Sequence, residues 1–151
     1  MTAVELLALG TSSQVPTRHR NHNGYLLRFG DVDFLFDPGE GTQRQLARAR
    51  VSVEKVRRIF LTHFHGDHCL GLAGVLQLLS AAEPAEPVAL HFPAAGRKYY
   101  ERAVEASIYD RRVALEPQPV TEEGLVFDDG RFRVEARRLS HGVPTYGYRL
   151  E

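Results

Sequence analysis

Short apolar runs alternate with polar, glycine-containing breaks along most of the chain, and two pairs of runs carry the signal of a β-hairpin. Gly30 and Asp31 separate the first pair, and Asp128, Asp129 and Gly130 separate the second. Longer stretches that are rich in helix formers, or apolar at helical spacing, lie between other runs. The pattern predicts strands over residues 4–9, 24–29, 32–36, 58–61, 88–92, 125–127, 132–139 and 145–150, and helices over residues 42–49, 70–82 and 95–107.

The order of these elements indicates the fold class. Strands follow one another in pairs as often as they alternate with helices, which favours an α/β protein with mixed sheets and outer helices over a simple parallel array. The 151 residues are enough for one domain with its own core, and they contain no internal repeat or low-complexity linker. The last residues, YGYRLE, end within a strand pattern. We therefore expect a single domain over residues 1–151 that is truncated on its C-terminal side.

Composition and charge exclude few functions. The formal net charge is zero, and basic residues only slightly outnumber acidic ones before Gly66, so charge alone does not indicate nucleic-acid binding. No apolar run approaches the length of a membrane span. Glu5 comes early and no basic segment precedes it, so the N-terminus is typical of a first strand and not of a signal peptide. Cys69 is the only cysteine, which favours a reducing, cytoplasmic location.

The stretch HFHGDH, residues 63–68, holds the clearest chemistry of the chain. In an extended segment His63 and His65 point the same way, so both imidazoles can reach one metal ion. Gly66 permits a sharp turn, after which Asp67 and His68 point to a neighbouring position. Burying these groups without a shared task would leave several polar atoms unsatisfied. We therefore predict a metal site; the mixed imidazole and carboxylate donors suit zinc, with manganese or iron as alternatives.

Other histidines are candidates to complete the site. His141 follows a predicted strand, where a turn can return it to the cluster. His91 lies inside an apolar strand and is more typical of a core residue, whereas His19 and His22 lie in a loop among arginines. Cys69 is expected to begin the buried helix and not to bind metal, since a free cysteine often packs as a small hydrophobe.

The ligands divide unevenly between two ions. Zinc takes about four ligands, or three protein ligands and a water in catalytic sites. Asp67 and His68 alone leave a second ion at least one ligand short, so we expect further ligands beyond Glu151. A first ion is predicted to have three histidine ligands: His63, His65 and His141.

The motif and three other stretches resemble a known family. HFHGDH matches the HxHxDH signature of the metallo-β-lactamase fold, which many hydrolases share. The stretches over residues 9–21, 36–46 and 140–149 narrow the resemblance to the ribonuclease Z family of tRNA 3′-processing endonucleases, over nearly the whole chain. GEGTQRQL and the PTRHRN loop are the more specific of these matches. The family loop reads Pro-x-Lys-x-Arg-Asn, and here Arg18 replaces the lysine, which keeps the charge and permits bidentate phosphate contacts.

The resemblance implies a fold, a metal content and an assembly. The family fold is a four-layer αββα sandwich, of which this chain holds about half and looks like the N-terminal half. The family has two zinc ions per complete active site and usually forms a homodimer. The family's bridging aspartate, last histidine ligand and proton-donating histidine have no match in this chain.

The resemblance also assigns roles to individual residues. His63, His65 and His141 match the ligands of one zinc, and Asp67 and His68 match ligands of the other. Asp67 also matches the proposed proton acceptor of the family. The loop that matches the tRNA-contacting segment supplies three candidate substrate-binding residues: Arg18, Arg20 and Asn21.

These matches imply a zinc-dependent endoribonuclease that removes the 3′ trailer from precursor tRNA by hydrolysing a phosphodiester after the discriminator nucleotide. The isolated 151-residue chain is expected to be inactive because its ligand set is incomplete. Two alternatives stay open. One is a related hydrolase of small phosphodiesters, sulfates or lactones, which HxHxDH fits equally well. The other is a metal-binding half-domain without turnover.

Overall fold

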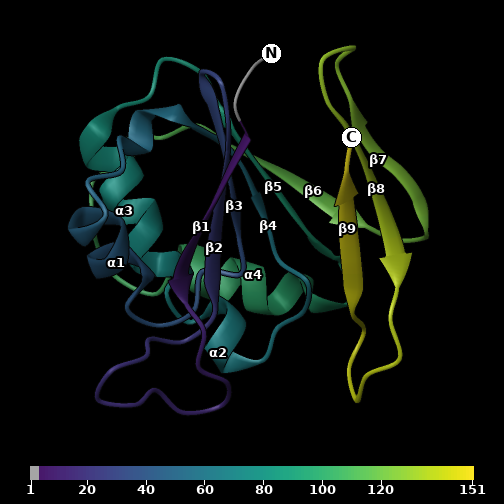
Figure 1. The fold of residues 1–151 in the computed structure, drawn as a ribbon, viewed down its shortest axis with the longest axis horizontal. Coiled ribbons are helices and arrows are strands. Elements are labelled where there is room, and N and C mark those ends of the chain that lie inside the picture. The colour runs from purple at the N-terminus through teal and green to yellow at the C-terminus, as the bar shows by residue number, and fades with distance from the viewer. Residues whose placement is uncertain (1–3) are drawn as a thin grey trace.

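The computed structural model describes residues 4–151 and consists of two β-sheets packed face to face, with helices on the outer face of the larger sheet (Figure 1). The larger sheet has six strands in chain order, β1 (Val4–Gly10), β2 (Gly24–Phe29), β3 (Val32–Phe36), β4 (Val56–Phe60), β5 (Val88–Pro93) and β6 (Leu115–Val120). The smaller sheet has three, β7 (Gly124–Asp128), β8 (Arg133–Arg138) and β9 (Tyr146–Leu150).

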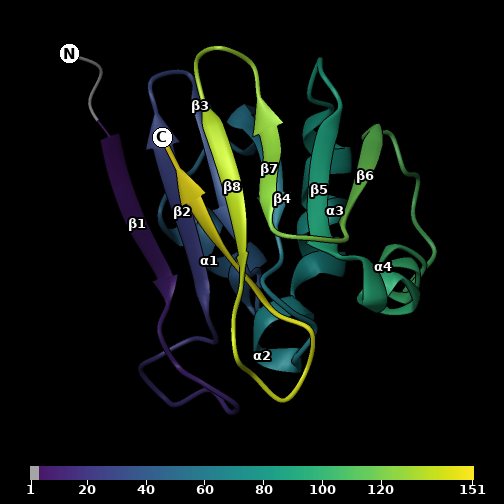
Figure 2. The ribbon, with the colours of Figure 1, turned by 90° about the vertical axis from the view of Figure 1, so that its right-hand side faces the viewer.

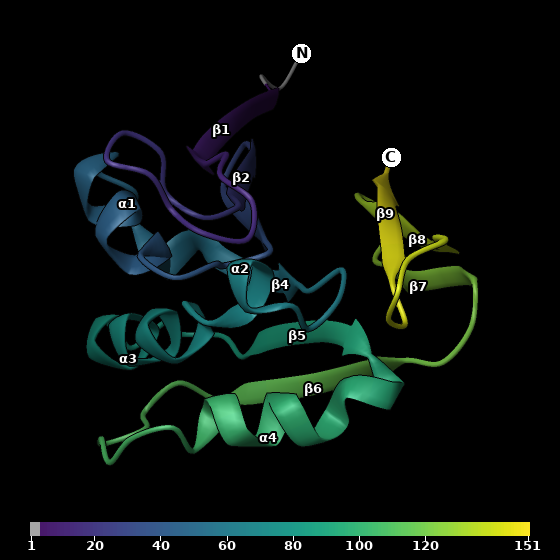
Figure 3. The same cartoon turned by 90° about the horizontal axis from the view of Figure 1, so that it is seen from below.

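Helices connect the parallel strands of the larger sheet. Strands β1 to β3 pair antiparallel, and β3 to β6 pair parallel, which confirms the predicted mixed sheet. Figure 3 shows the long helix between β4 and β5 on the side of this sheet away from β7, β8 and β9, and the helix between β5 and β6 alongside β6. None of the helices in residues 4–151 has the length and apolar character needed to cross a membrane. The helical elements are α1 (Thr42–Arg48), η1 (Val53–Lys55), α2 (Gly66–Cys69), α3 (Leu72–Ala82), η2 (Ala94–Gly96) and α4 (Arg97–Val104).

Alternating side chains of the central strands fill two separate apolar layers. Leu35 and Ile59 face the helices, whereas Phe34 and Phe60, their neighbours in sequence, face the smaller sheet. The ring of Phe34 meets that of Phe132 edge to face at a centroid distance of 5.1 Å. Burial on both faces holds β3 and β4 firmly, so the loops that follow these strands start from rigid positions.

The predicted hairpins are confirmed, and the predicted helices differ from the structure at their ends. The helix predicted over residues 70–82 is α3, which begins two residues later at Leu72 and ends at Ala82 as predicted; the short helix α2 that precedes it was not predicted. Glu83 ends α3 in the left-handed region, with φ of 49°, directly before Pro84. The helix predicted over residues 95–107 extends only over Arg97–Val104, after a short 3-10 turn.

Strand β6 was absent from the sequence prediction. Its sequence, LEPQPV, contains Pro117 and Pro119, which read as breaks in a strand pattern. The structure accommodates both prolines because β6 lies at the edge of the sheet and pairs only with β5. A proline lacks a backbone donor, and an edge strand needs donors on one side only.

Candidate metal centre

Loops from both sheets meet at the carboxyl ends of β3 and β4. Residues 37–41 follow β3 and residues 61–68 follow β4, and parallel pairing places both segments at the same end of the sheet. The loop between β8 and β9 reaches this point from the smaller sheet, next to α2 (Figure 2). The backbone N–H of Tyr146 donates to the carbonyl of Thr62 at 3.0 Å. This hydrogen bond ties the β8–β9 loop to the histidine segment.

Three of the predicted metal ligands come together in this region. Nε2 of His63 lies 3.1 Å from Nδ1 of His65, which in turn lies 3.2 Å from Nε2 of His141. The candidate ligand atoms of all three lie within 4.8 Å of one another. Around a tetrahedral zinc with Zn–N distances of about 2.0–2.1 Å, the nitrogens lie at distances from one another similar to the 3.1 and 3.2 Å between these imidazoles. The three imidazoles therefore fit one face of a zinc coordination sphere.

The electrostatics of His63 suit metal binding. Burial is the main cause that lowers the pKa of His63 to about 4, and the neighbouring His68 lowers it further. Its imidazole is therefore neutral at neutral pH, which is the form that binds metals. Nδ1 of His63 faces Oγ1 of Thr62 at 2.9 Å, so its other nitrogen, Nε2, is the one turned toward His65.

Asp67 and His68 lie beside this group but do not complete a second set of ligands. Oδ2 of Asp67 lies 3.5 Å from Nε2 of His68, which is also 3.1 Å from Nδ2 of Asn23. The backbone N–H of Gln14 donates to the same Asp67 oxygen at 2.8 Å. Burial acts to raise the pKa of Asp67, but this hydrogen bond and His68 outweigh it and lower the pKa below its ordinary value. Asp67 is therefore ionised at neutral pH.

The sharp turn predicted at Gly66 takes the form of a short helix. His65 is extended, with φ of −69° and ψ of 148°, and α2 begins at the next residue. Successive residues of a helix are about 100° apart around its axis, so Asp67 and His68 point in different directions from one turn. The glycine conformation is ordinary, and the change of direction comes from helix initiation.

Asp37, which the sequence analysis overlooked, organises this centre. Its carboxylate accepts hydrogen bonds from the backbone N–H and the hydroxyl of Thr62, at 2.7 and 2.8 Å, and lies 2.9 Å from Nδ1 of His68. Thr62 in turn contacts His63. Asp37 is buried and has a positive φ of 45°, which aspartate tolerates better than most residues. An acidic residue at the end of an apolar strand, in FDPG, is the signal that could have identified it.

Replacing Asp37 with alanine is expected to weaken zinc binding by about 10- to 100-fold, the usual effect of losing a carboxylate that orients a metal-binding histidine. The affinity is measured by competition with a chromophoric chelator, in the complete natural protein that carries this chain. Asp31→Asn, an exposed carboxylate at the other end of the same hairpin, is the control and should not change the affinity. Equal affinities of the two variants would contradict the orienting role.

The candidate substrate residues lie in the loop between β1 and β2, outside the histidine group. Arg18 and Arg20 are exposed, whereas the amide of Asn21 is engaged within the chain. Nδ2 of Asn21 donates to the carbonyl of Glu40 at 2.6 Å, and its Oδ1 accepts from Gln45 at 3.5 Å. Asn21 thus fastens the loop to the segment that begins α1.

The remaining histidines and the cysteine have other surroundings. His91 is buried and stacks on Phe60 at a ring distance of 4.5 Å, as expected of a core residue. His22 is buried and His19 is exposed in the same loop as Arg18. Cys69 ends α2, where the prediction had it begin the long helix, and it packs against the core; burial raises the pKa of its thiol to about 11. The thiol is therefore protonated at neutral pH.

Known proteins share this arrangement of sequence and fold. A sequence model described as the metallo-beta-lactamase superfamily matches residues 17–148. The chain belongs to this superfamily. Within the superfamily, ribonuclease Z from Streptomyces avermitilis is 51% identical over 150 residues, covering 99% of this chain and 50% of that protein. Ribonuclease Z from Nocardia farcinica is 54% identical over 151 residues, with the same coverage of 99% and 50%. The chain thus spans about half the length of these relatives.

Two solved structures share the fold of this chain. The short form of human tRNase Z superposes with a TM-score of 0.87 at 30% identity, over 97% of this chain and 64% of that chain. A diphosphatase of the PhnP family superposes with a TM-score of 0.74 at 20% identity, over 98% of this chain and 62% of that one. The second match, at 20% identity, shows only that the two chains share a fold.

Proposed function

We propose that the complete protein carrying this chain is a zinc-dependent ribonuclease Z, which removes the 3′ trailer from precursor tRNA. The observation that carries the proposal is identity of 51% and 54% to two proteins named ribonuclease Z over almost all of this chain. The grouping of His63, His65 and His141 supports it, because phosphodiester hydrolysis by this superfamily fold needs a metal-binding face.

The proposal gives each polar residue of the centre a role. His63, His65 and His141 hold one zinc, and Asp67 and His68 contribute to a second. Zinc, when bound, supplies positive charge that stabilises the negative charge developing on the phosphodiester. Asp37 and Thr62 hold the imidazoles of His68 and His63 in orientation.

Asp67 accepts the proton of the attacking water in this proposal. Its Oδ2 accepts hydrogen bonds from the backbone N–H of Gln14 at 2.8 Å and from the hydroxyl of Ser13 at 3.5 Å. Its lowered pKa keeps the carboxylate ionised and able to accept a proton. The fixed Oδ2 orients the side chain, and Oδ1 is the atom that takes the proton.

The loop residues and the assembly complete the proposal. Arg18 and Arg20 contact phosphates of the tRNA, while Asn21 holds their loop in place. A homodimer in the cytoplasm, expected from the family resemblance and from the single cysteine, stays a prediction.

Comparing two substrates tests the function. The complete protein is given precursor tRNA with a 3′ trailer, and separately bis-p-nitrophenyl phosphate, with zinc present in both assays. We expect one cut in the tRNA at the trailer junction, abolished by a chelator and restored by zinc. Rapid cleavage of the small diester with intact precursor tRNA would contradict the proposal and favour a hydrolase of small substrates.

A further inference from the structure

We propose that a cleft between the β1–β2 loop and α1 binds the phosphate backbone of the RNA, with Arg44 and Arg48 as binding residues in addition to Arg18 and Arg20. This inference rests on the proposed function and names the surface that guides the RNA toward the metal centre. The cleft has a volume of about 420 Å³. The cleft lies outside the HxHxDH signature. Arg44 falls within the stretch over residues 36–46 that carries the family resemblance, but neither Arg44 nor Arg48 is among the substrate-binding residues inferred from it.

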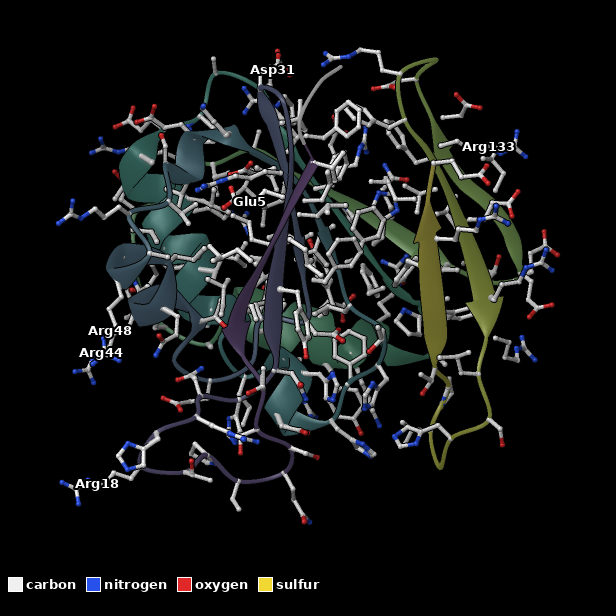
Figure 4. All side chains as sticks on the ribbon, viewed as in Figure 1. Glu5, Arg18, Asp31, Arg44, Arg48 and Arg133 are labelled. Atoms are coloured by element: carbon white, nitrogen blue, oxygen red, sulfur yellow. The ribbon has the colours of Figure 1, made fainter. Side chains whose placement is uncertain are left out.

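The β1–β2 loop forms one wall of the cleft, and α1 forms the other. Leu46 of α1 is fully buried against the sheet, so the opposite face of this helix must point to solvent. Arg44 and Arg48 are four residues apart and therefore lie on one face, and both are exposed and line the cleft. Figure 4 shows their side chains, and that of Arg18, extending from the ribbon on the same side of the molecule.

The charge of the cleft is strongly one-sided. Glu40 is the only carboxylate among the residues that line it, against four arginines. Over residues 4–151, the guanidinium groups of these four arginines have no carboxylate oxygen within ion-pair distance, whereas those of Arg28, Arg112 and Arg131 do. Unpaired guanidinium groups arranged around one hollow bind phosphates well, because each presents a planar fork of donors.

The cleft has a fixed shape. The hydroxyl of Thr17 accepts hydrogen bonds from the backbone N–H groups of His19 and Arg20, at 3.3 and 3.0 Å, which shapes the loop on one wall. Asn21 fastens this wall to the carbonyl of Glu40. A Cβ added at Gly41 would lie 2.3 Å from Oδ1 of Asn21, so the two walls meet closely at the base.

One loop connects the cleft with the metal centre. The backbone N–H of Gln14 holds Asp67, and Arg18 lines the cleft four residues later. Four residues span no more than about 14 Å even when fully extended. A strand of RNA with its reacting phosphate beside Asp67 therefore reaches the cleft within a few nucleotides. Charge, shape and distance together make the cleft a guide for the strand adjoining the cut.

The test measures the salt dependence of RNA binding in the complete protein. Asp67→Ala is present throughout, so that the precursor tRNA stays uncut during the titration. Onto this background we add Arg44→Gln with Arg48→Gln, or the control pair Arg97→Gln with Arg102→Gln, which removes the same charge from exposed positions on α4. Glutamine has nearly the helix propensity of arginine, so α1 should remain intact. Circular dichroism checks the folding of each variant.

We expect the α1 pair to reduce the slope of log Kd against log salt by about 1.5, since each lost phosphate contact contributes about 0.7–0.9. The Kd at moderate salt should rise about 10-fold, and the control pair should change neither quantity. Arg44→Lys with Arg48→Lys should restore the slope, because the charge returns. A slope equal to that of the control pair would overturn the inference.

Two further outcomes separate this inference from its alternatives. Equal competition by poly-glutamate and by RNA of the same charge would overturn the assignment to phosphates, since the cleft would then accept carboxylates. Failure of the unmodified protein to cut precursor tRNA would refute the proposed function. In that case a slope that still depends on Arg44 and Arg48 would support the cleft as an RNA-binding surface in its own right.

Discussion

Replacing Asp67 with alanine is expected to lower the rate of precursor tRNA cleavage by about 10³-fold, with less than a twofold change in RNA affinity. The carboxylate is both a candidate ligand and the proposed proton acceptor, and loss of a positioned base alone typically costs 10²- to 10⁴-fold. RNA affinity should persist because the phosphate backbone supplies most of it through arginines away from Asp67. Single-turnover cleavage and a binding titration of the same preparation measure the two quantities.

A matched variant separates this effect from a general change in charge. Glu54→Ala removes an exposed carboxylate from the 3-10 turn that precedes β4 and should leave the cleavage rate unchanged. If the Asp67 variant retains the parental rate, Asp67 is not the proton acceptor. If its zinc content falls in parallel with its rate, the role as a ligand accounts for the loss.

Replacing Gly71 with alanine is expected to destabilise the fold by about 3 kcal/mol, at the upper end of the usual cost of overpacking. A Cβ at this position would lie 1.9 Å from the carbonyl oxygen of Gly39, a backbone atom that cannot move aside by rotating a side chain. The φ of Gly71 is −80°, an ordinary value, so the cost is steric alone. Thermal unfolding followed by circular dichroism measures the loss.

The same substitution should disturb the metal centre. The N–H of Gly71 donates to the carbonyl of Pro38 at 2.9 Å, and a Cβ at Gly39 would lie 2.2 Å from the carbonyl of Asp67. Pushing these segments apart moves Asp37 away from His68, so zinc content should fall together with stability.

Gly74→Ala is the control for this experiment. Its Cβ would lie 3.0 Å from Oε1 of Gln43, the end of a flexible side chain that can move. Since Gly74 lies within α3, alanine should leave the stability unchanged or raise it by up to about 1 kcal/mol. Equal unfolding temperatures for the Gly71 and Gly74 variants would contradict the close backbone packing.

Much of the fold was predictable because local pattern and tertiary burial agree. The hairpin of β2 and β3 has the predicted bounds, since apolar runs and Gly30 specify strand and turn together. Strand β6 was missed because an edge position, which only the assembled sheet defines, is what tolerates Pro117 and Pro119. Helix α2 was missed because the four residues Gly66–Cys69 are too few to show a helical period in the sequence.

The candidate site was predictable to a similar extent. His63, His65, Asp67 and His68 are close in sequence, so their shared location follows from a short segment with restricted geometry. His141 was inferred from its place after a strand, and the structure brings it to within 3.2 Å of His65. Asp37 gave only the weaker signal of an acidic residue after an apolar strand, because its importance comes from contacts with Thr62 and His68, which are distant in sequence.

The sequence by itself determined the superfamily motif, the apolar and polar patterning that indicates strands and outer helices, and the donor types that suit zinc. These are properties of neighbouring residues and need no knowledge of long-range contacts. Only the tertiary structure decided which carboxylate orients His68, where Gly39 and Gly71 meet, and that Arg44 and Arg48 share a cleft with Arg18. Parallel strand pairing brings distant loops to one end of the sheet, and that pairing is a property of the whole fold.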